Sequence, residues 1–197
     1  EVLLANYEDF ERVARFKPVP LPGGDVATRE PWRTALSYCH SFDGVKKHDV
    51  NFVLQMINKN INSPLTSSCG RLFDAVAALI GLRTHNEFEG QAAMELTKIA
   101  DANETSCYDF KLGSLDIDFS PMIISIVDDV KRGVSQSIIS AKFHNTLVES
   151  LVSVCSRFAV HDSRVCLSGG CFQNVKLATG LKKRLEDTGF KVYTHSR

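Results

Sequence analysis

The segment Ser168-Gly169-Gly170 could form a binding site for a phosphate or a nucleotide. It follows an apolar run, residues 165–167, which is typical of a buried parallel strand. From Phe172 on, apolar residues recur at every third or fourth position, which predicts a helix, and residues 191–193 resemble a second strand. Such a βαβ unit directs free backbone N–H groups from its glycine turn toward a ligand above the sheet. On the glycine pair alone, a plain tight turn is the simpler interpretation.

Three other polar side chains could take part in binding, and each also has a simpler explanation. Asp74 lies on an amphipathic helix, where a carboxylate is usually solvated or capping, although its apolar neighbours turn it toward the buried face. Asn174 falls in the first turn of a predicted helix, where an amide often bonds the local backbone. His144 occupies a helix position that any polar residue could fill.

A cysteine and an acidic pair add further candidates. Cys171 flanks the glycine turn near a helix N-terminus, where the pKa of a thiol can fall, but no base stands beside it in the sequence. Asp128 and Asp129 resemble a metal or acid–base pair, but adjacent helical residues face different directions, so a solvated face is expected. The six cysteines are scattered without a Cys-x-x-Cys motif, which predicts reduced thiols and argues against a zinc site.

The composition is that of an ordinary globular chain. The 197 residues include 23 basic and 23 acidic side chains, and 44% are hydrophobic. A net charge of zero gives no reason to expect nucleic acid or an anionic membrane as the main partner. No apolar run approaches the roughly 20 residues that span a bilayer, and no secretory signal is visible. We therefore expect a cytoplasmic protein that binds neither nucleic acid nor membrane.

The elements that would position these residues form a mixed α/β pattern. Strands are expected at residues 2–5, 10–16, 108–112, 115–119, 165–167 and 191–193. Helices are expected at residues 27–42 and 51–58, from an N-cap at 66–68 to residue 80, at 91–100, 121–133 and 135–160, and from 172 onward. The polar segment 58–64 is the best candidate linker, which divides the chain into an N-terminal part, 1–62, and an α/β lobe, 63–197.

Four stretches in order resemble one family, the HypF carbamoyltransferases of nickel–iron hydrogenase maturation. They are residues 21–33 (LPGGDVATREPWR), 68–77 (SCGRLFDAVA), 88–93 (FEGQAA) and 167–174 (LSGGCFQN). The resemblance covers essentially the whole chain without large gaps. It implies a truncated ATP-binding domain of the actin/Hsp70/sugar-kinase (ribonuclease H-like) fold, helix-rich and with a mixed sheet.

The resemblance also implies an activity and a partner for the full protein. In that family, carbamoyl phosphate and ATP give carbamoyl-adenylate. The carbamoyl group then passes to the C-terminal cysteine of HypE and becomes the cyanide ligand of the active-site iron. ATP or carbamoyl-adenylate is therefore the expected ligand of this chain.

By the same resemblance, specific residues would contact the nucleotide. Gly169 and Gly170 would let it approach the backbone, and Asn174 would read the adenine, since an amide can donate and accept at once. Asp74 would accept hydrogen bonds from the ribose hydroxyls. Gly90 would allow its loop to close over ribose or phosphate, and Glu95 is a weaker ribose candidate.

The family's metal site is not found in this sequence. Its His-His-Ala-His motif is absent, and the six histidines show no such spacing. We therefore expect the ligands of a divalent metal to lie outside these residues. We also expect the chain to be an excised piece that contains no catalytic residue, is inactive alone and binds ATP weakly at best.

Two other classes of protein remain open. A related tRNA-modifying or sugar-kinase-type enzyme would share the fold, but the tRNA branch tends to carry a Pro-Gly-Gly-Pro loop where this chain has residues 89–93. A non-catalytic docking module would instead use Pro18, Pro20 and Pro22, whose spacing excludes a helix and favours an extended edge.

Overall fold

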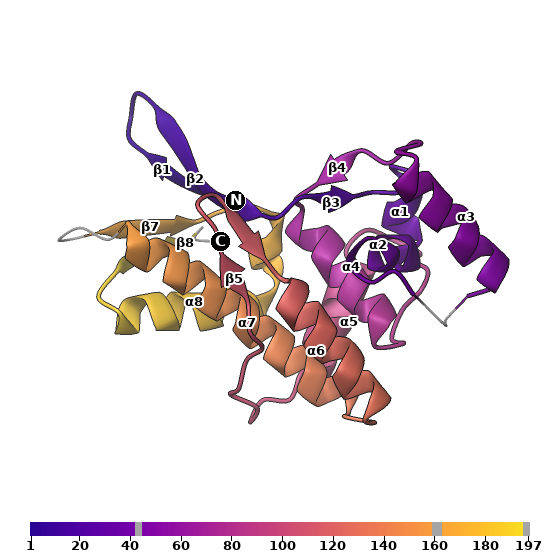
Figure 1. Ribbon diagram of the computed structural model, residues 1–197. Helices are drawn as coiled ribbons and strands as arrows, with labels where there is room; N and C mark the ends of the chain where they lie inside the picture. The colour runs from indigo at the N-terminus through magenta and orange to yellow at the C-terminus, as the bar shows by residue number, and fades with distance from the viewer. Residues whose placement is uncertain (42–44, 159–162, 195–197) are drawn as a thin grey trace.

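Four strands form a mixed sheet. The computed structural model describes residues 1–41, 45–158 and 163–194. Strands β1 (Val2–Ala5) and β2 (Phe10–Phe16) form an antiparallel hairpin that projects from the helices (Figure 1). Strand β2 also pairs in parallel with β6 (Asp116–Asp118), which pairs antiparallel with β5 (Lys111–Leu112). The sheet order β1-β2-β6-β5 confirms the predicted α/β class with a mixed sheet.

The N-terminal helices form a small layer of their own. They are α1 (Val26–Arg29), α2 (Pro31–Tyr38) and α3 (Lys47–Asn58). The single helix predicted for residues 27–42 is wrong, because the backbone leaves the helical region at Glu30 (φ −118°, ψ 75°). The ring of Pro31 disfavours a helical residue before it. The predicted end at Phe42 lies outside the described residues, and α3 begins four residues before the predicted start at Asn51.

The proline segment is an edge strand that is already paired. Strand β3 (Val19–Pro20) pairs antiparallel with β4 (Leu65–Thr66), which confirms an extended segment at this place. The N–H groups of Leu21 and Gly23 donate to the Pro64 and Asn62 carbonyls at 2.8 and 2.7 Å. These bonds lie on the side of the segment that faces β4. Among the described residues the outer edge stays unpaired, but Pro18, Pro20 and Pro22 have no N–H group to offer another strand there.

Four further helices build the body of the molecule. They are α4 (Cys69–Leu79), α5 (Gln91–Ile99), α6 (Ser120–Lys131) and α7 (Gln136–Arg157). Ser68 caps α4 and Ser135 caps α7, each through a side-chain oxygen that accepts a backbone N–H. The predicted end of the last of these helices at residue 160 lies outside the described residues. No helix in the described part of the chain is long and apolar enough to cross a membrane.

The C-terminal βαβ unit is present, with a later helix start than predicted. Strands β7 (Arg164–Leu167) and β8 (Lys191–Thr194) pair in parallel. Between them lie a 3₁₀ turn (Gly170–Gln173) and helix α8 (Val175–Asp187). The helix starts after Asn174 rather than at Phe172, because the Asn174 side chain caps it and the tighter turn uses the preceding residues.

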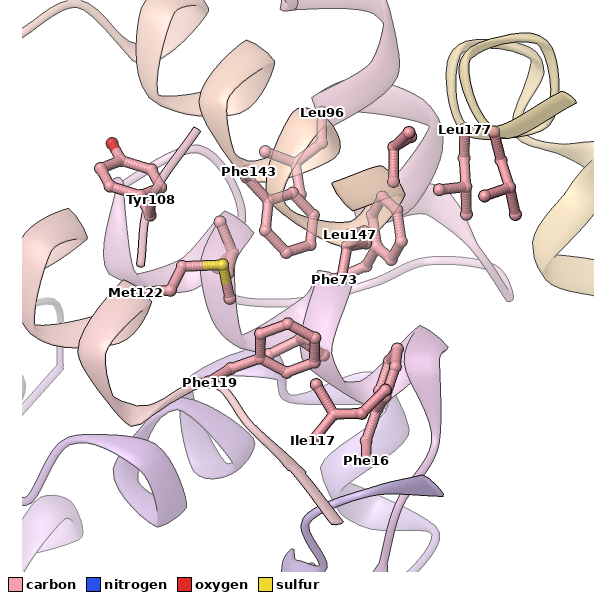
Figure 2. Packing of buried hydrophobic residues seen from close by; sticks show 14 of the residues in the cluster. Phe16, Phe73, Leu96, Tyr108, Ile117, Phe119, Met122, Phe143, Leu147 and Leu177 are labelled. Carbon is pink, nitrogen blue, oxygen red and sulfur yellow. The ribbon is translucent and has the colours of Figure 1, made fainter. Parts of the chain in front are cut away.

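The main core lies where α4, α5, α6 and α7 meet the sheet. Phe73 packs edge-to-face on Phe143 at 4.8 Å between ring centroids, and Phe16 packs likewise on Phe119 at 4.9 Å (Figure 2). A second cluster packs α2 and α3 against α4, with Trp32 among its buried members. Both this cluster and the β3–β4 pair contain residues from before and after position 62. The predicted division of the chain into parts 1–62 and 63–197 stays a prediction.

Candidate functional site

The glycine turn follows directly on strand β7 and leaves open space beside its backbone. Gly169 has φ 101° and ψ 167°, a conformation almost restricted to glycine. A Cβ atom placed on Gly169 or on Gly170 would meet no other described residue within 4 Å, chain neighbours aside. The glycine at 169 is therefore required by backbone conformation, while Gly170 leaves room for a group from outside the chain.

Asn174 ends this turn and is held by two hydrogen bonds. Its Oδ1 accepts the backbone N–H of Leu177 at 3.0 Å, so the residue is the N-cap of α8. Its Nδ2 lies 3.1 Å from Nε2 of His144 on α7. The local backbone role weighed for Asn174 is thus present, and it fixes the amide beside the glycine turn.

His144 is the point where four elements meet. It is 1% exposed, and its Nδ1 lies 2.7 Å from the Ser140 carbonyl one turn earlier. Its ring packs edge-to-face on Phe73 of α4 at 5.3 Å, and its Nε2 lies 3.4 Å from Thr97 of α5. Burial lowers the pKa of His144 to about 4, so the ring is neutral near pH 7. The buried surroundings were not visible in the sequence, where the residue fits a polar helix position.

A pair of thiols links the glycine turn to the start of α4. The side chains of Cys69 and Cys171 are hydrogen-bonded, and this bond lowers the pKa of Cys171 to about 6. The backbone N–H groups of Cys171 and Gly70 act in the same direction. The same bond and burial raise the pKa of Cys69. The sequence placed no partner beside Cys171, because Cys69 lies about a hundred positions away.

Asp74 lies inside the protein. Its side chain is 3% exposed and pairs with Arg71 at 3.0 Å, and Nδ2 of Asn86 donates to its Oδ1 at 3.1 Å. Burial raises the pKa of Asp74 to about 6, although Arg71 and Asn86 oppose the shift. Oδ2 makes no hydrogen bond of good geometry despite the nearby Arg71. A ribose role for Asp74 stays a prediction, and it requires the Asn86 segment to move.

Gly90 is the N-cap of α5 and has a left-handed conformation (φ 78°), with open space among the described residues where a Cβ would be. The loop before it is closed by side chains of the next two turns. The Glu87 N–H donates to Gln91 at 2.8 Å, and Gln91 donates to Glu95 at 3.1 Å. Arg83 donates to the same Glu95 at 3.0 Å, so this carboxylate is engaged within the chain.

The acidic pair on α6 corrects a sequence prediction. Asp128 is solvated, but the expected solvated position of Asp129 is wrong, because its side chain is 3% exposed. Asp129 accepts hydrogen bonds from the Tyr108 hydroxyl at 2.7 Å and from Lys142 at 3.0 Å, and it also pairs with Arg132. A buried carboxylate with three donors is structural. Among the described residues, no group of three or more histidine, cysteine or acidic side chains could hold a metal ion.

The predicted residues therefore fall into two groups. Gly169, Gly170 and Asn174 lie on one short segment beside the start of α4. Asp74 lies within the packing of α4, and Gly90 is the N-cap of the neighbouring α5. Hydrogen bonds and ring contacts of His144 connect α4, α5 and α7 to Asn174. The arrangement is an open glycine turn after a parallel strand, flanked by an oriented amide and a thiol pair.

Comparison with known proteins shows that the chain is similar to carbamoyltransferases. Residues 1–197 match the family description "Carbamoyltransferase, Kae1-like Domain, second subdomain". The chain is 37% identical to Carbamoyltransferase HypF of Rhodobacter capsulatus over 96% of its length, and 31% identical to that of Rhizobium leguminosarum bv. viciae over 97%. The chain thus belongs to the HypF carbamoyltransferase family. It spans 26% of the length of each of these two relatives.

Two solved structures share the fold over 98% of the chain. The crystal structure of full-length HypF in the phosphate- and nucleotide-bound form matches with a TM-score of 0.91 and 38% identity, over 33% of that protein. The crystal structure of T. kodakarensis HypF matches with a TM-score of 0.85 and 26% identity, over 28% of that protein. The α/β fold predicted from the sequence is therefore confirmed.

Proposed function

We propose that the chain is the nucleotide-contacting portion of a longer cytoplasmic carbamoyltransferase. In this proposal, carbamoyl phosphate and ATP give carbamoyl-adenylate. The carbamoyl group then passes to the C-terminal cysteine of HypE for synthesis of the cyanide ligand. Gly169 and Gly170 lie against the nucleotide, Asn174 contacts the adenine, and residues outside the chain hold any divalent metal.

The observation that carries the proposal is the open turn after β7. Among residues 1–41, 45–158 and 163–194, none apart from the chain neighbours lies within 4 Å of a Cβ position on Gly169 or Gly170. Glycine there lets a ligand approach the backbone. A solved relative that matches 98% of this chain is bound to phosphate and nucleotide. Turns between a strand and a helix in α/β sheets are common sites for such ligands.

The predicted contacts of Asp74 and Gly90 would each require a change in the structure. Asp74 would need to exchange its bond with Asn86 for ribose hydroxyls. Gly90 would act through the conformation of its loop, which is closed here by Gln91. Both contacts remain part of the proposal, and both are expected to depend on movement of residues 83–90.

The alternative functions find less support in the geometry. A docking module that uses Pro18, Pro20 and Pro22 would use the outer edge of β3, where these prolines have no N–H group to offer an added strand. A tRNA-modifying or sugar-kinase-type enzyme shares the fold, but the family match covers residues 1–197 of the carbamoyltransferase type.

The test is an Asn174→Ser substitution in the full-length protein that carries this chain. Serine keeps an oxygen that can cap α8 but removes the amide, so the fold should be retained. We expect carbamoyl-phosphate-dependent release of pyrophosphate from ATP to fall about tenfold or more at limiting ATP, since a lost polar contact in a binding site costs on the order of 1–3 kcal/mol.

The control is Asn103→Ser at an exposed position, which should leave the rate unchanged. Equal rates for the Asn174→Ser variant and the unmodified protein at limiting ATP would contradict the proposed contact.

A further inference from the structure

The proton positions on His144 follow from its hydrogen bonds. Nδ1 lies 2.7 Å from the Ser140 carbonyl oxygen, which can only accept a hydrogen bond, so Nδ1 carries the proton. A neutral imidazole has one N–H, and therefore Nε2 is an acceptor. The ring is 1% exposed, and its hydrogen-bond partners in the described part of the chain include no carboxylate, so burial favours the neutral form.

Nε2 then decides the orientation of the Asn174 amide. The group 3.1 Å from Nε2 must be a donor, which places the NH₂ of Asn174 toward His144. Oδ1 then faces the Leu177 N–H at 3.0 Å, where an acceptor is needed. The Thr97 hydroxyl is farther from Nε2, at 3.4 Å, and it donates to the Ala93 carbonyl at 2.8 Å. Both bonds of Asn174 thus select the same orientation.

We propose that His144 is a positioning residue that fixes the Asn174 amide in one orientation and thereby gives the site its preference for adenine over hypoxanthine. The inference rests on the proposed contact between Asn174 and the base. With its two internal bonds made, the amide keeps one N–H and one oxygen lone pair. Adenine offers a matching N–H donor beside a ring-nitrogen acceptor, whereas hypoxanthine offers a carbonyl acceptor beside an N–H. Hypoxanthine would require the opposite orientation of the amide.

Two substitutions of His144 test the hydrogen bonds of Nδ1 and Nε2 separately. His144→Gln places an amide oxygen near the position of Nε2 and can still accept from Asn174. His144→Asn places an amide near the position of Nδ1 and can still donate to Ser140, but it leaves nothing to accept from Asn174. Both remove the aromatic contact with Phe73, so a merely structural role would affect them alike.

The first experiment uses nitrogen-15 NMR of the 197-residue chain at pH 7. We expect a protonated Nδ1 and an unprotonated Nε2 on His144. We also expect the Asn174 side-chain amide signals to be retained in His144→Gln and displaced in His144→Asn. A protonated Nε2, or equal displacement in both variants, would overturn the proposal without any reference to a nucleotide.

The second experiment compares ATP with ITP as substrate in the full-length protein. We expect the ratio of kcat/KM for ATP over ITP to fall about tenfold in His144→Asn and to be retained in His144→Gln, since a bidentate base contact contributes about 1–3 kcal/mol of discrimination. Asn174→Ser distinguishes a failure of the proposed base contact from a failure of the positioning role of His144. An unchanged ratio in Asn174→Ser refutes the proposed base contact. If the ATP-over-ITP ratio falls in Asn174→Ser but stays unchanged in His144→Asn, the positioning role of His144 is refuted and the base contact of Asn174 is not.

Discussion

The two glycines of the turn should respond in opposite ways to alanine. Gly169 has φ 101° and ψ 167°, where a side chain adds backbone strain of about 1–3 kcal/mol. Alanine also lowers the entropy of the unfolded chain, which returns about 0.4–1 kcal/mol. Because the new methyl group meets no atom within 4 Å, no clash adds to the strain. From the mid-range values of these two effects, Gly169→Ala should reduce the free energy of unfolding by about 1–2 kcal/mol.

Gly170→Ala is the matched control for stability. Gly170 is not among the residues with positive φ, and its Cβ would also meet open space. The unfolding free energy should stay the same or rise by up to about 1 kcal/mol. Under the proposed function, the same methyl group would occupy the space beside the nucleotide and weaken ATP binding in the full-length protein.

The assay is thermal and urea unfolding of the two variants and the unmodified chain. A loss of 1–2 kcal/mol corresponds to a fall in Tm of roughly 2–8 °C for a chain of this size. Equal stability of Gly169→Ala and the unmodified chain would refute the backbone conformation assigned to the turn. A large loss in Gly170→Ala would refute the open space beside it.

Two predictions concern groups with altered pKa values. The pKa of Asp74 is raised from 3.8 to about 6 in the folded chain, so folding favours its protonated form and stability should fall as pH rises from about 4 to about 6. The loss is about 3 kcal/mol at 1.36 kcal/mol per pKa unit, and urea titrations should show it in the unmodified chain but not in Asp74→Asn; an identical pH dependence of the two would contradict it. The lowered pKa of Cys171 predicts that its alkylation by iodoacetamide has a midpoint near pH 6, and Cys69→Ala should move that midpoint upward. Cys107, whose pKa is raised mainly by burial, is the internal comparison in peptide mass spectrometry, and a Cys171 midpoint insensitive to Cys69 would exclude the thiol pair.

Most elements could be predicted because their local signals agree with the tertiary structure. The α4 helix has a serine cap, an apolar stripe and a glycine just past its end. Its end was predicted within one residue, and its N-cap is one of the three residues 66–68 that were predicted. The break at Glu30 was missed, although the following proline carries the signal for it. The late start of α8 was missed because a 3₁₀ turn and an α-helix place apolar residues at similar spacings.

The interior polar residues could not be predicted, for a physical reason. Helix α7 runs through the core, so it buries Ser140, His144, Thr146 and Ser150 as well as its apolar face. A sequence pattern with one polar side predicts a solvated face when the helix lies at the surface, and the sequence does not say which helix is central. Asp129 was misassigned for the same reason, since its partners Tyr108 and Lys142 come from other elements.

Partners distant in the sequence were also beyond prediction. The resemblance pointed to Asp74 and Asn174 but not to the residues that hold them. Asn86 reaches Asp74 from a loop, and His144 reaches Asn174 from a different helix. Only the fold shows that the first of these two candidates is enclosed and the second lies at the end of an open turn.

The central claim is that the turn after β7 contacts a nucleotide. The most direct measurement is an NMR titration of the 197-residue chain with ATP, which follows its backbone amides and detects weak binding. We predict that the largest shifts occur at Gly169, Gly170 and Asn174, with smaller shifts toward residues 83–90. Saturable shifts centred elsewhere in the chain, with the amides of the turn unmoved, would contradict the account.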